Sequence, residues 1–198
     1  MKLSKRILDI VLSSTAITFL SPLFILIAIS IYIEDKGPSF FKQIRVGQHG
    51  RCFSIIKFRT MTNVPHIPIS FIDISNKHRI TQIGYWLRRF KIDELPQVFN
   101  VLQGQMSFVG PRPEMPFFVS HYTSQEKKVL NFLPGITDLA SVQFRHEERL
   151  FECESDPEEL YLDQIMHEKL RLSIEYAKSA NMKSDIHIII LTLRKLFD

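Results

Sequence analysis

The pattern of hydrophobic and polar positions begins with one long apolar stretch. No charged residue occurs from Ile10 to Ile33, and a membrane-spanning helix needs only about 20 apolar residues. The stretch therefore predicts a helix that lies in a lipid bilayer. A cleaved signal peptide is the alternative, because Lys2, Lys5 and Arg6 precede the stretch and Ala28-Ile29-Ser30 resembles a cleavage site. However, the apolar run is longer than the core of a typical signal peptide.

Basic residues flank this apolar stretch on both sides. Three precede it, and six follow from Lys36 to Arg59 with no acid among them, so both flanks favour the cytoplasmic side. Pro22, in the middle of the stretch, removes a helix hydrogen bond and bends the chain, and Ser21 can satisfy a freed backbone group. We therefore predict a re-entrant helix-break-helix over residues 1–35, which enters and leaves one face of the membrane. A straight span with a tolerated proline is the alternative.

Shorter periodic patterns follow in residues 36–198. The segments 40–46 and 51–58 predict two strands around a glycine-containing turn, and most of the other apolar positions recur at helical spacing. The expected helical segments are 83–90, 95–102, 117–130, 157–180 and 186–197. The fold class is therefore α+β: a small, mostly helical cytoplasmic domain with a short β-hairpin and amphipathic interfacial helices. The last helix, 186–197, can pack in the core or lie on the membrane surface.

The composition indicates one globular domain beside the membrane segment. Of the 198 residues, 45% are apolar and 23% are charged, which excludes a disordered protein. The two cysteines, Cys52 and Cys153, are far apart in the sequence and belong to no Cys/His cluster. This spacing argues against a disulfide framework and against a zinc site.

The basic residues are concentrated next to the membrane segment. From Lys36 to Lys91 the chain has eleven Lys or Arg and one acid, Asp73, whereas after Lys91 it has seventeen acids and eleven bases. A basic surface at this place suits anionic lipid headgroups or a phosphorylated substrate at the membrane. Nucleic-acid binding is less favoured, because no RNP, zinc-finger or recognition-helix pattern accompanies the charge.

Two adjacent carboxylates, Asp93 and Glu94, occur where we expect a helix to start. Pro96 suits a first helical turn, which makes Asp93 the predicted N-cap. In one interpretation both acids only cap the helix and complement its dipole. In the other, they bind a divalent metal beside a phosphate, and cations such as Arg88 keep Asp93 ionised and nucleophilic.

Three further cations are candidates for binding phosphate. Arg112 lies in Gly110-Pro111-Arg112-Pro113, where two prolines stiffen the loop and present the guanidinium with little loss of entropy. Lys57 and Arg59 share one face of a strand, with Phe58 on the other. The alternatives are a surface arginine in a loop and a solvated strand face.

These motifs together resemble one known family. The membrane segment with a central Ser-Pro is followed by KFRTM at 57–61, IDELPQ at 92–97, MSFVGPRP at 106–113 and PGIT at 134–137. In this order they resemble the bacterial sugar transferase family, and specifically its small monotopic phosphoglycosyl transferases. The resemblance implies transfer of a sugar-1-phosphate from a UDP-sugar to a polyprenol phosphate such as undecaprenyl phosphate. It also implies release of UMP, initiation of a surface glycan or glycoprotein oligosaccharide, and a re-entrant hairpin in the bacterial cytoplasmic membrane with the catalytic domain on the cytoplasmic face.

The resemblance also implies roles for individual residues. Asp93 matches the nucleophile that forms a phosphosugar-aspartyl intermediate, and Glu94 matches its partner. Both would contact a magnesium ion, Mg2+, that bridges the carboxylates and the diphosphate. Arg112 matches the phosphate-binding arginine, and Arg59, Arg88 and Arg145 stand at positions that match basic residues. Lys57 is a further expected substrate contact, and a homodimer is left open.

The sequence departs from the family pattern at two places. Gln105 follows Gly104 where the family usually has Asp, and the run after Thr137 begins with Asp138 and ends in Gln143-Phe144-Arg145. We interpret these departures as changes in nucleotide or sugar recognition. Two other classes of protein stay open: a membrane-tethered basic module that binds lipid or nucleic acid without catalysis, and a secreted carboxylate hydrolase.

Overall fold

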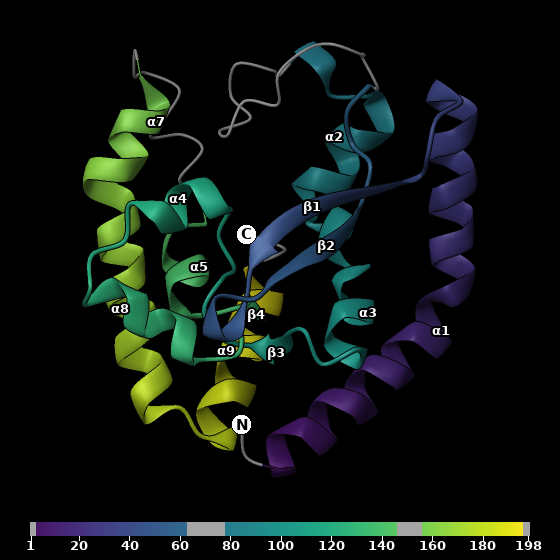
Figure 1. Cartoon of the computed structure of the whole chain (residues 1–198). Helices are drawn as coiled ribbons and strands as arrows, with labels where there is room; N and C mark the ends of the chain where they lie inside the picture. Colours follow the sequence, from purple (N-terminus) through teal and green to yellow (C-terminus); the bar gives the residue numbers. More distant parts are fainter. Residues whose placement is uncertain (1–2, 63–77, 146–155, 196–198) are drawn as a thin grey trace.

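The computed structural model describes residues 3–62, 78–145 and 156–195 (Figure 1). The long helix α1 lies on one side of the molecule and the helices α7 and α8 on the other, with the strand pair β1 and β2 between them. The first elements are α1 (Leu3–Asp35), β1 (Phe40–Val46), β2 (Cys52–Phe58), α2 (Gln82–Arg89) and α3 (Gln97–Leu102). The rest are β3 (Ser107–Val109), α4 (Pro116–Ser120), β4 (Gly135–Thr137), α5 (Leu139–Gln143), α7 (Pro157–Leu160), α8 (Met166–Ser179) and α9 (Met182–Arg194). The mostly helical α+β architecture is confirmed.

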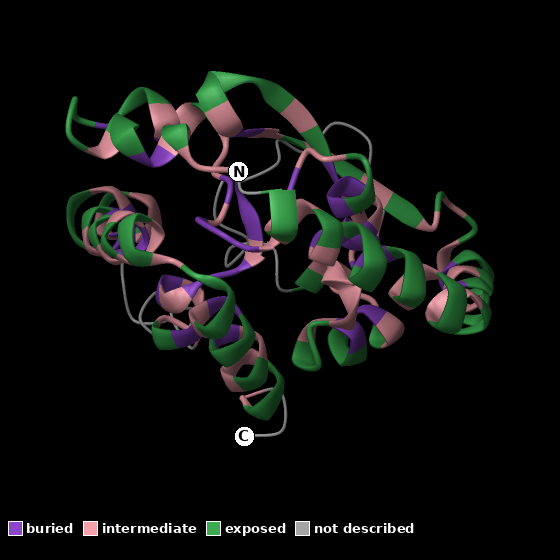
Figure 2. Ribbon diagram, turned by 90° about the horizontal axis from the view of Figure 1, so that it is seen from below, coloured by how far each residue is buried: buried purple, intermediate pink, exposed green. Residues whose placement is uncertain are grey.

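The N-terminal apolar stretch forms one helix, α1, with Pro22 inside it. Figure 1 shows that the helix changes direction along its length, and Ser21 Oγ donates to the carbonyl oxygen of Thr18 at 2.9 Å. The expected interruption at Ser21-Pro22 is therefore not a break, because the helical backbone continues through the proline. Within the described residues, α1 is the one helix long and apolar enough to cross a membrane, and exposed positions predominate along it (Figure 2).

Both ends of α1 are attached to the rest of the domain. Near the N-terminal end, Arg6 donates to the carbonyl oxygens of Val101 and Leu102 at 2.7 and 2.8 Å. At the C-terminal end, Asp35 pairs with Arg59 at 3.1 Å. The hydrogen bonds of Arg6 satisfy carbonyls at the C-terminal end of α3, where a helix leaves acceptors without partners. The long apolar helix α1 is therefore attached at both ends to the domain that carries the two carboxylates.

The predicted β-hairpin is confirmed. β1 and β2 pair antiparallel with Phe40 opposite Phe58 and Val46 opposite Cys52. A second, smaller pair joins β3 and β4 in parallel. There the two backbone segments lie so close that a Cβ on Gly135 would be 2.1 Å from the backbone nitrogen of Gly110. Only glycine therefore fits at position 135.

The core has two main parts. One lies between α1, β2, α2 and α3 and contains five buried side chains: Phe24, Ile31, Phe58, Leu87 and Val98. The other lies under α4, α7 and α8 and contains Phe118, Tyr122, Val129, Tyr161, Ile165, Met166 and Leu170. Phe24 of α1 meets Phe58 of β2 edge-on, with ring centroids 5.6 Å apart. Apolar burial therefore ties the membrane helix to the strand that carries Lys57.

The later helices differ in part from the expected segments. The segment 117–130 is not one helix, because α4 ends at Ser120 and a separate 3₁₀ helix covers Glu126–Asn131. The segment from Pro157 is helical, with one π turn at Tyr161–Ile165 before α8. The last helix, α9, buries Ile188 and exposes Leu193. It is therefore both a core element and an exposed apolar surface.

Candidate active site

The two carboxylates lie on a tight turn between α2 and α3. Lys91 adopts a left-handed backbone conformation with φ of 54°, and a 3₁₀ turn then covers Ile92–Glu94. The prediction of Asp93 as an N-cap is wrong, because α3 begins at Gln97 with Pro96 at the cap position. The chain changes direction at Lys91, and only one 3₁₀ turn, Ile92–Glu94, lies between Lys91 and the cap of α3 at Pro96. The predicted end of the helix is confirmed by Gly104, whose φ of +81° favours glycine.

Glu94 is held by two cations from distant segments. Its Oε1 accepts hydrogen bonds from Lys57 Nζ at 2.8 Å and from Arg112 at 2.5 Å, and its Oε2 accepts a second bond from Arg112 at 3.2 Å. Burial would raise the pKa of the Glu94 carboxyl, but Arg112 and Lys57 lower it well below its usual range. Glu94 is therefore a fixed carboxylate that joins the end of β2 to the loop after β3.

The loop that carries Arg112 is pinned on both sides. Gly110 donates its backbone N–H to the carbonyl oxygen of Thr137, and Gly135 donates to that of Pro111, each at 3.0 Å. Beyond the loop, Val46 of β1 donates to the carbonyl oxygen of Glu114 at 2.8 Å. Proline geometry and these backbone bonds together fix the direction of the arginine.

A second ion pair, which the sequence did not reveal, extends the network. Arg45 lies 3.3 Å from Glu114 and donates to the carbonyl oxygen of Pro113 at 3.2 Å. The hydroxyl of Tyr161 donates to Glu114 Oε1 at 2.6 Å. The sequence shows only that Arg45 is a charged residue in a basic strand. It does not show that this strand lies beside the loop of Arg112, so the pair with Glu114 could not be predicted.

Asp93 differs from Glu94 in its surroundings. Its Oδ1 is buried and has no hydrogen-bond partner among the residues that the structure describes. Burial and the charge of Glu94 raise the pKa of Asp93 to about 6, although Lys57, Lys91 and Arg88 oppose the shift. The cations thus favour the ionised form of Asp93 as expected, but desolvation and the adjacent carboxylate, which the sequence analysis did not consider, shift its pKa upward. Asp93 therefore has a carboxylate oxygen to which none of the described residues donates a hydrogen bond.

The other predicted phosphate-binding residues are not all near the pair. Arg88 lies close enough to lower the pKa of Asp93, and its Nε donates to Thr60 Oγ1 at 2.8 Å. Arg59 points instead toward the end of α1, where it pairs with Asp35. Arg145 follows α5, and no hydrogen bond or ion pair of the described residues joins it to the carboxylates. The structure thus brings Lys57, Arg88 and Arg112 to the pair.

The two departures from the family pattern have structural partners. Asp138 is buried, caps α5 by accepting from the Ser141 N–H at 2.7 Å, and accepts from Ser173 Oγ of α8 at 2.5 Å. Gln105 accepts from Asn100 Nδ2 at 2.7 Å. Asp138 therefore joins α5 to α8, a role that requires no ligand.

The oxygen atoms of the carboxylate pair indicate whether the site could hold a magnesium ion. No group of three His, Cys, Asp or Glu comes together in residues 3–62, 78–145 and 156–195. Within the described residues the pair still offers the carboxylate of Asp93, whose Oδ1 has no partner, and one lone pair on Glu94 Oε2. Magnesium is commonly held by one or two carboxylates together with substrate phosphates. The residues fit an ion that shares its ligands with a bound diphosphate.

This fold and site define a domain with one long apolar helix, in which two partly buried carboxylates and the cations around them suit phosphoryl transfer. The chain belongs to the bacterial sugar transferase family, whose profile matches residues 1–198. It is 34% identical over 200 residues to the UDP-glucose:undecaprenyl-phosphate glucose-1-phosphate transferase of Klebsiella pneumoniae. It is 33% identical over 202 residues to the protein of that name from Caulobacter vibrioides. It is also 32% identical over 198 residues to the UDP-N-acetylgalactosamine-undecaprenyl-phosphate N-acetylgalactosaminephosphotransferase of Aeromonas hydrophila.

These similarities cover nearly all of this chain but different shares of the relatives. They include 98%, 98% and 97% of the chain, and 40%, 70% and 43% of the three relatives respectively. The chain therefore spans less than half the length of two of them. The family profile extends over the apolar helix α1 and over both carboxylates.

Proposed function

We propose that the protein transfers a sugar-1-phosphate from a UDP-sugar to undecaprenyl phosphate and releases UMP. The transfer would start the assembly of a surface glycan or glycoprotein oligosaccharide. Membership of the family and the names of the relatives support the reaction. The observation that carries the proposal is the contrast within the carboxylate pair: Asp93 has a buried oxygen to which no described residue donates, while Glu94 is held by Lys57 and Arg112.

The geometry supports a two-step displacement with Asp93 as nucleophile. A carboxylate oxygen of Asp93 attacks the phosphorus that carries the sugar, and the bond from that phosphorus to the bridging oxygen breaks, so that UMP leaves with the electron pair. An oxygen of undecaprenyl phosphate then attacks the same phosphorus. The bond to Asp93 breaks and restores the carboxylate, and the lipid carries the sugar diphosphate.

Cations of the chain stabilise the charge that develops during these steps. Arg112 and Lys57 both contact Glu94, which orients them before the substrate arrives. Arg88 lies close enough to Asp93 to lower its pKa. Magnesium, when bound to Asp93, Glu94 and the diphosphate, would neutralise charge on the phosphate oxygens.

Contacts at the two ends of α1 support a re-entrant arrangement in the membrane. A straight span would place the ends on opposite sides of about 30 Å of hydrocarbon. In this chain Arg6, near one end, and Asp35, at the other, both bind residues of the same domain. We propose that α1 enters and leaves the cytoplasmic face of the bacterial inner membrane, with its bend near Ser21-Pro22 deepest in the lipid.

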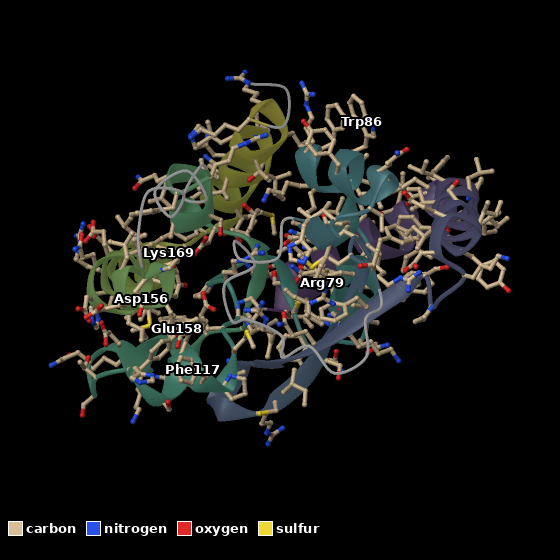
Figure 3. The ribbon with its side chains drawn as sticks, turned by 90° about the horizontal axis from the view of Figure 1, so that it is seen from above. Arg79, Trp86, Phe117, Asp156, Glu158 and Lys169 are labelled. Atoms are coloured by element: carbon tan, nitrogen blue, oxygen red, sulfur yellow. The ribbon has the colours of Figure 1, made fainter. Side chains whose placement is uncertain are left out.

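The exposed aromatic residues of α2 support the same orientation. Trp86 projects outward from α2 (Figure 3) and is 53% exposed, next to Tyr85 and Phe90. The guanidinium of Arg89 lies 5.5 Å from the centroid of the Trp86 ring. Aromatic and basic side chains of this kind favour the boundary between lipid and water. The active site would then lie where a lipid phosphate can reach it.

The test is UMP release by the protein in nanodiscs with magnesium, undecaprenyl phosphate and a panel of UDP-sugars. We expect one or a few UDP-sugars to give UMP, with continued release only when the lipid acceptor is present. Asp93→Asn is the inactive control. A folded, membrane-bound protein that releases UMP from none of the UDP-sugars would overturn the proposed function.

A further inference from the structure

One buried amide lies a single turn beyond the two carboxylates, and neither step of the proposed reaction uses it. Gln97 is 1% exposed, and its Nε2 has no hydrogen-bond partner among the described residues. Most buried polar atoms in folded proteins have a partner, because a buried donor without one destabilises the fold. A group that is kept in this state next to a reactive carboxylate indicates a role in the reaction.

Helical geometry directs the Gln97 side chain toward the carboxylates. The backbone is helical from the 3₁₀ turn Ile92–Glu94 through Pro96 into α3. Gln97 follows Glu94 by three positions and Asp93 by four, and residues at these spacings are neighbours on a helix. Side chains on a helix also lean toward its N-terminal end. The amide of Gln97 therefore extends toward the turn that carries the acids.

Two contacts with β2 show which face of α3 carries Gln97. Asn100 Oδ1 accepts from the backbone N–H of Ile56 at 3.0 Å, and Glu94 Oε1 accepts from Lys57 at 2.8 Å. Gln97 is three positions from Asn100 and three from Glu94, so its side chain lies between these two contacts, on the face that α3 turns toward β2. Its Nε2 is therefore enclosed beside the acids.

The atom that complements this donor is the inner oxygen of Asp93. Asp93 Oδ1 and Gln97 Nε2 are both buried, and neither has a hydrogen-bond partner within the described residues. The two atoms are not bonded to each other in this structure, but the terminal torsions of Asp and Gln side chains are soft, so rotation can bring donor and acceptor together. Phosphorus reaches Asp93 through its other oxygen, because Oδ1 is enclosed.

We propose that Gln97 is a positioning residue that donates a hydrogen bond to Asp93 Oδ1 and thereby favours discharge of the phosphosugar intermediate. This inference rests on the proposed function, because it takes Asp93 to be the nucleophile. In the discharge step an oxygen of undecaprenyl phosphate bonds to phosphorus. The bond from phosphorus to Asp93 breaks, and its electron pair restores the carboxylate.

The hydrogen bond acts differently on the two half-reactions. A donor binds an ionised carboxylate more strongly than it binds the neutral carbonyl of the intermediate. The amide therefore stabilises free Asp93 relative to the intermediate, so it opposes formation of the intermediate and favours its discharge. Loss of the amide should leave formation as fast or faster and should slow discharge, whereas damage to the fold would slow both.

The experiment follows the intermediate by intact-mass spectrometry, with protein in nanodiscs and the UDP-sugar that gives UMP. Gln97→Met replaces the amide by an apolar side chain of similar length. Without lipid acceptor, the adduct should form at least as fast as in wild type, and the UMP concentration that reverses it should rise about tenfold. After undecaprenyl phosphate is added, discharge of the adduct should be about tenfold slower than in wild type.

Stability and a matched control separate a positioning role from a structural one. Gln97 Nε2 has no partner to lose among the described residues, so Gln97→Met should leave the thermal unfolding midpoint unchanged or raise it. Gln103→Met alters an exposed glutamine at the other end of α3 and should change neither half-reaction. Gln97→Asn withdraws the amide by one methylene and should also slow discharge, which keeps the test available if Gln97→Met does not fold.

The outcomes distinguish this inference from the proposed function. Discharge at the wild-type rate in Gln97→Met or Gln97→Asn would overturn the inference, and so would equal slowing of both half-reactions with a lowered unfolding midpoint. In either case adduct formation and UMP release by wild-type protein would leave the proposed function intact. Wild-type protein that forms no adduct and releases no UMP from any UDP-sugar would contradict the proposed function, and the inference with it.

Discussion

Two clusters of ion pairs in this protein use the same kinds of side chain in different ways. On α8, Arg171 pairs with Glu168 and Glu175 at the i+3 and i+4 spacings of a helix, and all three side chains are mostly exposed. At the active site, Glu94 pairs with Lys57 and Arg112, and these three residues come from three separate segments of the chain. The Glu94 side chain is only 13% exposed. The surface cluster needs only a helix, whereas the buried cluster needs the complete fold.

The difference lies in what each cluster can do for the protein. Exposed pairs contribute little, because water and salt screen them. A buried carboxylate with two cations is held in one position and fixes those cations in turn. Glu94 thereby orients Lys57 and Arg112 around the site, while Asp93 keeps an oxygen without a partner in the part of the chain that the structure describes. The following predictions test this contrast.

Asp93→Asn should have the largest effect on activity. An amide cannot form the phosphosugar intermediate, so UMP release should fall by about 10⁴-fold or more, as for other essential nucleophiles. Asn is nearly isosteric with Asp, and Asp93 Oδ1 has no partner to lose among the described residues. The thermal unfolding midpoint in nanodiscs should therefore stay close to that of wild type. A variant with appreciable turnover would exclude Asp93 as the nucleophile.

Glu94→Gln should have the largest effect on stability. The neutral amide removes the charge of Glu94 from Lys57 and Arg112, while its carbonyl still accepts one hydrogen bond. We expect a loss of about 2–3 kcal/mol in the free energy of unfolding, together with a large loss of activity. Thermal unfolding and UMP release are measured on the same sample. Unchanged stability would show that Glu94 does not hold the two cations.

Asp138→Ala should lower the free energy of unfolding by about 2 kcal/mol, through loss of the α5 cap and of the partner of Ser173. Because Asp138 is buried and joins α5 to α8, the order of preference among UDP-sugars should not change. The measurement compares UMP release across the panel with that of wild type. An altered preference would instead support a role of this residue in sugar recognition.

The pH dependence of kcat/KM should reflect Asp93. Its pKa is raised to about 6 by burial and by Glu94, so the carboxyl carries a proton below that pH and cannot attack phosphorus. We expect kcat/KM to be level above pH 6 and to fall by about tenfold for each pH unit below it. Glu94 should add no step in this range, because its pKa is lowered well below the usual value. A level profile down to pH 5 would contradict the raised pKa.

Arg171→Ala should have the smallest effect, because the cluster on α8 is exposed. The unfolding midpoint and UMP release should both match wild type within error. This variant is the matched control for Glu94→Gln, since both disrupt a three-residue ion cluster. A loss of stability as large as that of Glu94→Gln would remove the contrast between the two clusters.

Local pattern was sufficient to predict several parts of the protein. Alternation in 40–58 predicted the hairpin, and the prolines beside Arg112 predicted its fixed loop. The adjacent acids and the nearby cations predict where the site lies, and the structure brings Lys57, Arg88 and Arg112 to the acids. These features depend on backbone preferences and on residues close together in the sequence.

The remaining features depend on contacts between distant segments. The ion pair of Arg45 with Glu114 requires the hairpin to run beside the loop of Arg112. Arg59 was expected at the phosphates, but the packing of α1 against β2 brings it to Asp35. Arg6 counted only as a positive flank, yet it caps the end of α3. The sequence contains no local signal for such partners, because tertiary packing decides them.

The most direct test of the account is to trap the intermediate. Protein in nanodiscs is mixed with the UDP-sugar that gives UMP, without undecaprenyl phosphate, and is analysed by intact-mass and peptide mass spectrometry. The account predicts one added sugar phosphate on the peptide that contains Asp93, its loss when undecaprenyl phosphate is added, and no adduct in Asp93→Asn. Acceptor-dependent UMP release by a protein that never carries this adduct would contradict it.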